Sequence, residues 1–218
     1  MEALWLAILG FVVSHLIPAL PFLRRRLVAA WGMKGYIAVY SFLSTLVFLW
    51  VAWAYKQAPY VEIWPKAAWH NGIALAAMLG AVFLGVGAFS SANPLSVGIG
   101  GKGFDATRPG ILRLTRHPLI WAMILWAGGH IPANGDVASL LLFTPMLLLS
   151  LGGLFLVDFK RKQSLGLARW DDAARLTSAG RLVWAEIGLK RLVITLVVYL
   201  GLLLAHPWVI GVDPLGMF

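Results

Sequence analysis

The chain has 218 residues, of which 60% are hydrophobic and only 12% are charged. Soluble domains carry about 45–50% apolar and about 25% charged residues, so this chain has too much apolar surface for a single buried core. Lipid is therefore expected to be the solvent for most of its length, which excludes a soluble domain as the carrier of its chemistry. The absence of cysteine excludes disulfides, thiolate metal ligands and a cysteine nucleophile.

Six apolar stretches come close to the length of about 20 residues that a membrane-spanning helix needs. They cover residues 3–20, 35–55, 67–89, 111–131, 137–157 and 191–209. The fourth stretch reaches this length only if the polar residues 111–117 continue the same helix, and we expect that they do. The sequence thus predicts an all-α integral membrane bundle of about six transmembrane helices, which form one domain over residues 1–218.

The basic residues indicate the orientation of this bundle. Lys56 and Lys66 lie in the connection between the second and third stretches, and the other sixteen of the 18 lie on the opposite side. The sixteen are Arg24, Arg25, Arg26, Lys34, Lys102, Arg108, Arg113, Arg116, Lys160, Arg161, Lys162, Arg169, Arg175, Arg181, Lys190 and Arg191. Basic loops remain in the cytoplasm, so both termini are expected on the outer side. The formal net charge of +9 is therefore a topology signal, and we expect no nucleic-acid partner.

Two of the basic connections are long. Residues 90–110 are rich in glycine, but no strand precedes them and the spacing of a P-loop is absent, so they predict no phosphate site. The last basic connection is expected to contain a short helix at about residues 163–177 that lies on the membrane surface. At the start of that connection, Asp158 is expected to form a local ion pair with Lys160 or Arg161.

All five histidines lie in or beside the expected spans. An ionisable side chain inside a membrane is costly, and imidazole is a common ligand of metals and of haem iron, so each histidine is a functional candidate. No His-x-x-x-His pair occurs, so the ligands of any such site would come from separate helices. His15 lies in an otherwise apolar span and is interpreted as functional. His70 and His206 lie near the interface and are interpreted as helix caps or interhelical hydrogen bonds.

Arg113, Arg116 and His117 form the densest polar cluster in the sequence. Pro118 follows them and suits the first turn of a helix, where no backbone N–H is needed. At the cytoplasmic mouth of the fourth span, the three side chains could hold an anionic group. Alternatively, the two arginines only anchor the span through the positive-inside effect. The residue types do not decide between these readings.

Short motifs follow one another along nearly the whole chain. They are Ser14-His15 with Arg24, Leu114-Thr115-Arg116-His117-Pro118, Trp126 with His130, Asn134-Gly135-Asp136 and Ala205-His206-Pro207-Trp208. In this order they resemble the NnrU family, which includes bacterial membrane proteins associated with denitrification and the plastid zeta-carotene isomerase. The resemblance implies a bundle of about six membrane helices in the bacterial inner membrane.

The resemblance to the carotene isomerase implies haem b as the cofactor, with His15 and His130 as its axial ligands. The resemblance to the bacterial members implies a role in nitrite and nitric oxide metabolism, and the resemblance to the isomerase implies a redox-dependent isomerase as the alternative. At 1.5 Å per helical residue, His15 lies about 5 Å inward of the middle of its span and His130 about 7 Å outward. By depth in the membrane alone, His15 pairs better with His117, and His130 with His206. We nevertheless keep His15 and His130, the pair that the resemblance implies, as the expected ligands.

The chain also has a partial resemblance to the isoprenylcysteine carboxyl methyltransferases, carried by Arg116 and His117 before a proline. It implies S-adenosylmethionine held by these two residues at the cytoplasmic mouth of the helix. Two positions depart from that group, since Ile120 and Ala122 stand where it has Tyr and Gly. Its paired glutamates are also missing, and Asp158 is the nearest substitute.

Three hypotheses follow from these observations. The first is a haem-binding protein of the NnrU type, the second an S-adenosylmethionine-dependent methyltransferase, and the third a non-enzymatic assembly factor for a membrane reductase. The partners that they imply are the lipid bilayer and either a membrane reductase or a lipophilic small molecule.

Overall fold

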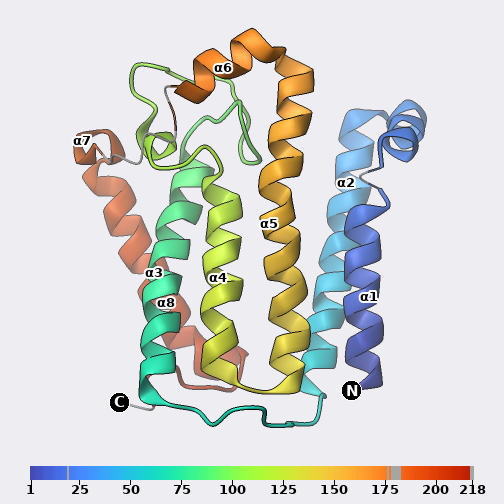
Figure 1. Ribbon diagram of the computed structural model, residues 1–218, viewed down its shortest axis with the longest axis vertical. Helices are drawn as coiled ribbons and strands as arrows, with labels where there is room; N and C mark the ends of the chain where they lie inside the picture. The colour runs from blue at the N-terminus through green and yellow to red at the C-terminus, as the bar shows by residue number, and fades with distance from the viewer. Residues whose placement is uncertain (19, 176, 178–182, 217–218) are drawn as a thin grey trace. The chain divides into compact units, whose positions relative to one another are not determined.

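The computed structural model describes residues 1–18, 20–175, 177 and 183–216, and these residues form helices and loops with no named strand (Figure 1). The helices are α1 (Glu2–Leu16), α2 (Pro21–Lys56), α3 (Ala68–Ser90), the 3-10 helix η1 (Gly110–Arg113), α4 (Pro118–Asn134), α5 (Val137–Leu165), α6 (Leu167–Arg175), α7 (Trp184–Ile187) and α8 (Leu189–Val209). Ala19, Leu176 and Arg181, which fall in segments considered above, lie outside the described residues.

Four of these helices, α2, α3, α5 and α8, are long and apolar enough to cross a membrane. Two others fall short of the length of about 20 residues that a span needs, since α1 has 15 residues and α4 has 17. The expectation of an all-α membrane bundle is therefore confirmed.

The expectation that residues 111–117 continue the fourth helix is wrong. The short helix η1 ends at Arg113, and α4 begins at Pro118. Proline has no N–H to donate to a preceding turn, and its ring disfavours the helical conformation of the residue before it. His117 therefore lies in irregular backbone just ahead of α4, where its side chain can turn toward neighbouring segments.

Two other helix boundaries follow from glycine. The helix α2 begins at Pro21, earlier than the expected residue 35, but it bends at Gly32, whose φ of 70° and ψ of 167° are accessible almost only to glycine. Gly166, with a φ of 81°, separates α5 from α6. The predicted short helix at about residues 163–177 is thus present as α6, while α5 continues to Leu165.

The chain divides into two compact units, and α5 begins in the first and ends in the second. The first unit contains Met1–Pro65 and Gly135–Pro145, and in it α1 packs along α2. The turn before α5 also belongs to this unit. There Asp136 caps the helix, because one carboxylate oxygen accepts the N–H of Ser139 at 3.0 Å and the other accepts its hydroxyl.

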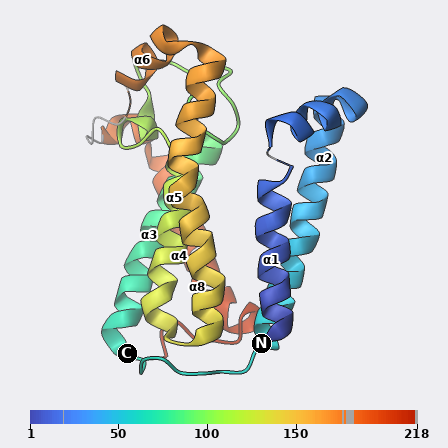
Figure 2. The same cartoon turned by 45° about the vertical axis from the view of Figure 1, so that its right-hand side comes forward.

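The second unit contains Lys66–Asn134 and Met146–Phe218, and its core lies where α3 packs against α4 and α8. In both views α3 and α4 run side by side (Figures 1 and 2). The buried core consists of Ala81, Leu84, Ile111, Leu112, Ala122 and Ile187. At one end of this unit, the loop of residues 91–117 meets α6 and α7, and we call this the basic end. At the other end, which we call the C-terminal end, α3 begins and α4 and α8 finish.

Small residues set the distance between α3 and α4. A Cβ atom on Gly129 would lie 2.6 Å from the Cβ of Ala77, whereas one on Gly128 would meet nothing closer than Leu147 at 3.9 Å. We therefore expect Gly129→Ala to lower the free energy of unfolding by about 1–3 kcal/mol through overpacking.

The matched control is Gly128→Ala, which should leave the stability unchanged or raise it by up to about 1 kcal/mol, because alanine is the better helix former. Both effects can be measured by thermal or denaturant unfolding of the purified protein in detergent. Equal effects of the two substitutions would contradict the proposed close packing.

Candidate functional site

His117 lies at the centre of a polar cluster at the basic end of the second unit. Its Nδ1 lies 2.8 Å from the hydroxyl of Ser96, and its Nε2 lies 2.8 Å from Oδ1 of Asp158. The imidazole is almost fully buried, with 4% of its residue surface exposed. These contacts join three segments that are distant in the sequence, namely the loop after α3, the start of α4 and α5.

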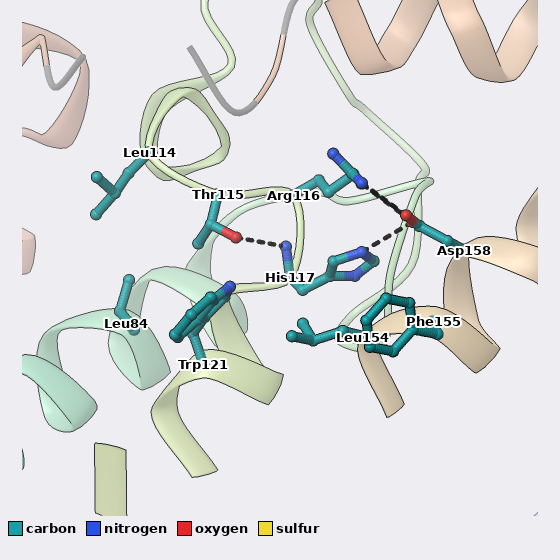
Figure 3. Close-up of a pocket in the computed structure, with 9 residues that line it drawn as sticks. All are labelled: Leu84, Leu114, Thr115, Arg116, His117, Trp121, Leu154, Phe155 and Asp158. Atoms are coloured by element: carbon teal, nitrogen blue, oxygen red, sulfur yellow. Dashed lines mark hydrogen bonds and ion pairs between the residues drawn. The ribbon is translucent and has the colours of Figure 1, made fainter. Parts of the chain in front are cut away.

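Arg116 binds the same carboxylate from the other side (Figure 3). Its Nε lies 3.0 Å from Oδ1 of Asp158, and its Nη2 lies 2.6 Å from Oδ2. The expectation that Asp158 pairs locally with Lys160 or Arg161 is therefore wrong. Among the described residues, Asp158 pairs with Arg116 and His117. Arg161 instead donates to the main-chain oxygen of Ser96 at 2.8 Å.

The loop after α3 is shaped to hold this cluster. The side chain of Asn93 accepts the N–H of Leu95 at 2.9 Å and donates to the main-chain oxygen of Arg116, also at 2.9 Å. Asn93 and Ser96 are both buried. The sequence pointed to neither residue, although an asparagine before a proline in a glycine-rich connection is typical of such a turn.

Burial lowers the pKa of His117 below its ordinary value of 6.5, and the nearby carboxylate of Asp158 only partly opposes this shift. The ring is therefore neutral at neutral pH. In the neutral ring, Nε2–H donates to Asp158 and Nδ1 accepts the hydroxyl proton of Ser96. This chain of Ser, His and Asp has the composition of a hydrolase triad, but Ser96 is fully buried and cannot reach a substrate.

A cavity of about 540 Å³ opens beside this cluster. Its lining residues are Leu84, Leu114, Thr115, Arg116, His117, Trp121, Leu154, Phe155 and Asp158 (Figure 3). The walls are mostly apolar and come from α3, α4 and α5, while the polar groups gather around Asp158. The cavity thus combines an apolar body with one polar corner.

Arg113 does not join Arg116 and His117 in this cavity. It forms a bidentate ion pair with Glu186 of α7, with Nη2 and Oε1 2.8 Å apart, and the N–H of Gly110 donates to the same carboxylate. The guanidinium of Arg113 lowers the pKa of Glu186. Arg113, Arg116 and His117 therefore do not form the single cluster that the sequence predicted. Arg113 instead links η1 to α7 through its ion pair with Glu186.

Two histidines meet at the C-terminal end of the second unit. His130 and His206 both line a cavity of about 300 Å³ between α3, α4, α8 and the segment that follows α8. In each ring Nδ1 faces a main-chain oxygen, that of Trp126 at 2.7 Å for His130 and that of Val212 at 2.6 Å for His206. The two histidines that the comparison of depths grouped together thus line one cavity, whereas His15 lies in the first unit.

The other two histidines have local partners. His15 lies in the first unit, where its Nδ1 faces the main-chain oxygen of Phe11 at 2.8 Å and its ring stacks on that of Phe11. His70 accepts the N–H of Ala67 at 3.3 Å and so caps α3, which confirms its interpretation as a cap. Within the described residues, no three side chains of histidine, aspartate or glutamate form a group that could hold a metal ion.

The lowered pKa of His117 predicts a dependence of stability on pH. The neutral ring is favoured in the folded protein, so the unfolded chain binds this proton more readily, and stability falls as the pH decreases below about 6.5. The substitution His117→Gln keeps a donor for Asp158 but cannot titrate. We expect its melting temperature in detergent to fall less than that of the wild type between about pH 7 and pH 5.5. Parallel pH profiles of the two proteins would contradict this role.

The family model described as NnrU protein matches residues 3–214 of the 218. No curated protein and no solved structure matches the chain significantly. The matched region includes all five histidines and, except for Gly216, every lining residue of the two cavities described above, and it extends over the ordered motifs. The chain therefore belongs to the NnrU family.

Proposed function

We propose that this NnrU-type membrane protein binds haem b at the C-terminal end of the second unit, with His130 and His206 as the axial ligands. The observation that carries the proposal is the pair of imidazoles on the wall of one cavity. A haem iron can take one imidazole on each side of its plane, and helical membrane proteins commonly build such sites from facing helices.

The hydrogen bonds of both rings suit this role. In haem and metal sites, the nitrogen that does not bind the metal usually donates to a carbonyl oxygen, which fixes the tautomer and orients the ring. Nδ1 of His130 and Nδ1 of His206 face such oxygens. Nε2 of each ring would then be the ligating atom.

The remaining walls of this cavity also suit a haem. Ala74, Leu75, Leu202 and Leu203 provide an apolar surface for the macrocycle, and Lys66 provides a cation for a propionate carboxylate. A volume of about 300 Å³ holds only part of a porphyrin. Binding would therefore require Asp213, Pro214 and Gly216, which also line the cavity, to move outward while Val212 keeps its contact with His206.

Bound haem would supply one-electron redox chemistry to the membrane. Together with the resemblance to membrane proteins of denitrification, this chemistry supports a role in nitrite or nitric oxide metabolism. A redox-dependent isomerase is the alternative that uses the same cofactor. The third hypothesis, a non-enzymatic assembly factor, makes a different prediction. Such a factor would still support the assembly of its membrane reductase after all five histidines are replaced.

The absorption spectrum of the protein purified in detergent tests this proposal. We expect a Soret band whose intensity is lost in His130→Ala and which is lost or shifted in His206→Ala, because each substitution removes one axial ligand. The control His70→Gln changes a histidine that caps α3 and should leave the band unchanged.

The variant His15→Ala distinguishes the two possible ligand pairs. An unchanged band in this variant supports His130 with His206. Loss of the band in His15→Ala, with no effect of His206→Ala, would instead support His15 with His130. A wild-type protein that shows no Soret band after expression with ample haem would contradict haem binding.

A further inference from the structure

The cavity at the basic end is a separate site, and we infer that it binds a membrane-dissolved amphiphile whose neutral polar end, a hydroxyl group of an alcohol or quinol, donates a hydrogen bond to Asp158. This inference does not depend on the proposed haem, because the haem cavity lies at the other end of the second unit and shares no lining residue with this one.

The first argument is the hydrogen-bonding capacity of Asp158. An ionised carboxylate offers about four lone-pair positions. Oδ1 accepts from His117 and from Nε of Arg116, while Oδ2 accepts from Nη2 of Arg116 at 2.6 Å and shares the Nε–H at 3.2 Å. Three N–H donors thus serve about four lone-pair positions among the described residues. The side chain of Asp158 lines the cavity and is 17% exposed, so Oδ2 can accept one more donor from the cavity.

The second argument is charge. Arg116 and Asp158 neutralise one another in a bidentate ion pair, and the buried ring of His117 is neutral. An anionic group would meet the carboxylate of Asp158, and a cationic group would meet the guanidinium of Arg116. A neutral donor avoids both repulsions and the cost of burying another charge. The polar corner therefore favours a hydroxyl over a carboxylate or an ammonium group.

The third argument is the complementary donor that Thr115 provides. The hydroxyl oxygen of Thr115 accepts the N–H of His117 at 3.2 Å, and Thr115 lines the cavity. Among the residues that the structure describes, the proton of this hydroxyl has no acceptor, so it can be donated to a ligand. A ligand hydroxyl is both a donor and an acceptor, so it can bind Asp158 and Thr115 at the same time.

The fourth argument concerns the rest of the cavity. Leu84, Trp121, Leu154 and Phe155 form its apolar wall on α3, α4 and α5, and its volume lies within the range of about 300–1,000 Å³ that is usual for small-molecule sites. Trp121 is 39% exposed and Phe155 is 78% exposed, which leaves the wall open beside the helices. An apolar chain can therefore lie against these residues while its hydroxyl reaches Asp158.

The test uses the full-length protein in lipid nanodiscs and a long-chain primary alcohol that carries a photoreactive diazirine in its chain. Its methyl ether, its carboxylic acid and its amine are the matched probes. We expect the alcohol to label peptides that contain Trp121 or Phe155 in a saturable manner. The ether cannot donate to Asp158, and it should bind about tenfold more weakly or worse, as expected for the loss of one hydrogen bond to a charged group.

A second measurement fills the cavity without altering the polar cluster. Leu154→Trp should abolish the saturable labelling, whereas Leu156→Trp, on the same helix but outside the lining, should not. Because the acceptor is Asp158, Asp158→Asn should weaken binding of the alcohol, while Glu186→Gln in the neighbouring ion pair should have no effect.

Equal labelling by the alcohol and its ether, or unchanged labelling in Leu154→Trp, would overturn the inference. Displacement of the alcohol by S-adenosylmethionine but not by excess unlabelled alcohol would also overturn it, and would assign the cavity to a nucleoside ligand. The Soret band reports on the other cavity, so failure of this site and failure of the proposed haem site give separate results.

Discussion

A carboxylate near the end of an apolar helix organises the basic end of this protein. Asp158 lies in a partly buried position where an unpaired charge would be costly, and breaking a buried pair by removing one partner is strongly destabilising. Arg116 and His117 satisfy it with short hydrogen bonds from two sides. Because these partners precede α4 and Asp158 belongs to α5, the pairing holds the two helices and the loop between α3 and η1 in one arrangement. The adjoining cavity owes its polar corner to this interaction.

The two ends of the second unit differ in their chemistry. At the basic end, His117 has a side-chain partner at each ring nitrogen, so its capacity is used within the protein. At the C-terminal end, His130 and His206 each turn Nδ1 toward a main-chain oxygen on the wall of a common cavity. The first arrangement positions a carboxylate, and the second is the site where we propose that haem binds. The proposed amphiphile site and the proposed haem site follow from this difference.

The break in the helix ahead of Pro118 determines the geometry of the site. Buried backbone polar groups need partners wherever a helix is interrupted. At this break, Asn93 donates to the main-chain oxygen of Arg116. The same break in the helix frees His117 to face Ser96 and Asp158. Proline at this position thus contributes to both the local backbone and the geometry of the cluster.

The sequence by itself determined the all-α membrane class, the approximate positions of the apolar helices, the presence of the short helix α6 and the NnrU family, because apolar length and ordered motifs are local properties of the chain. It also selected His117 and Arg116 as polar residues at the start of α4. It did not predict the break at residues 114–117, or the division of the arginines between Asp158 and Glu186. Only the tertiary structure decided these partners, since His117 contacts Ser96 and Asp158 across 21 and 41 residues of sequence. Pairings of this kind depend on which helix faces pack together, and helical periodicity does not specify that choice.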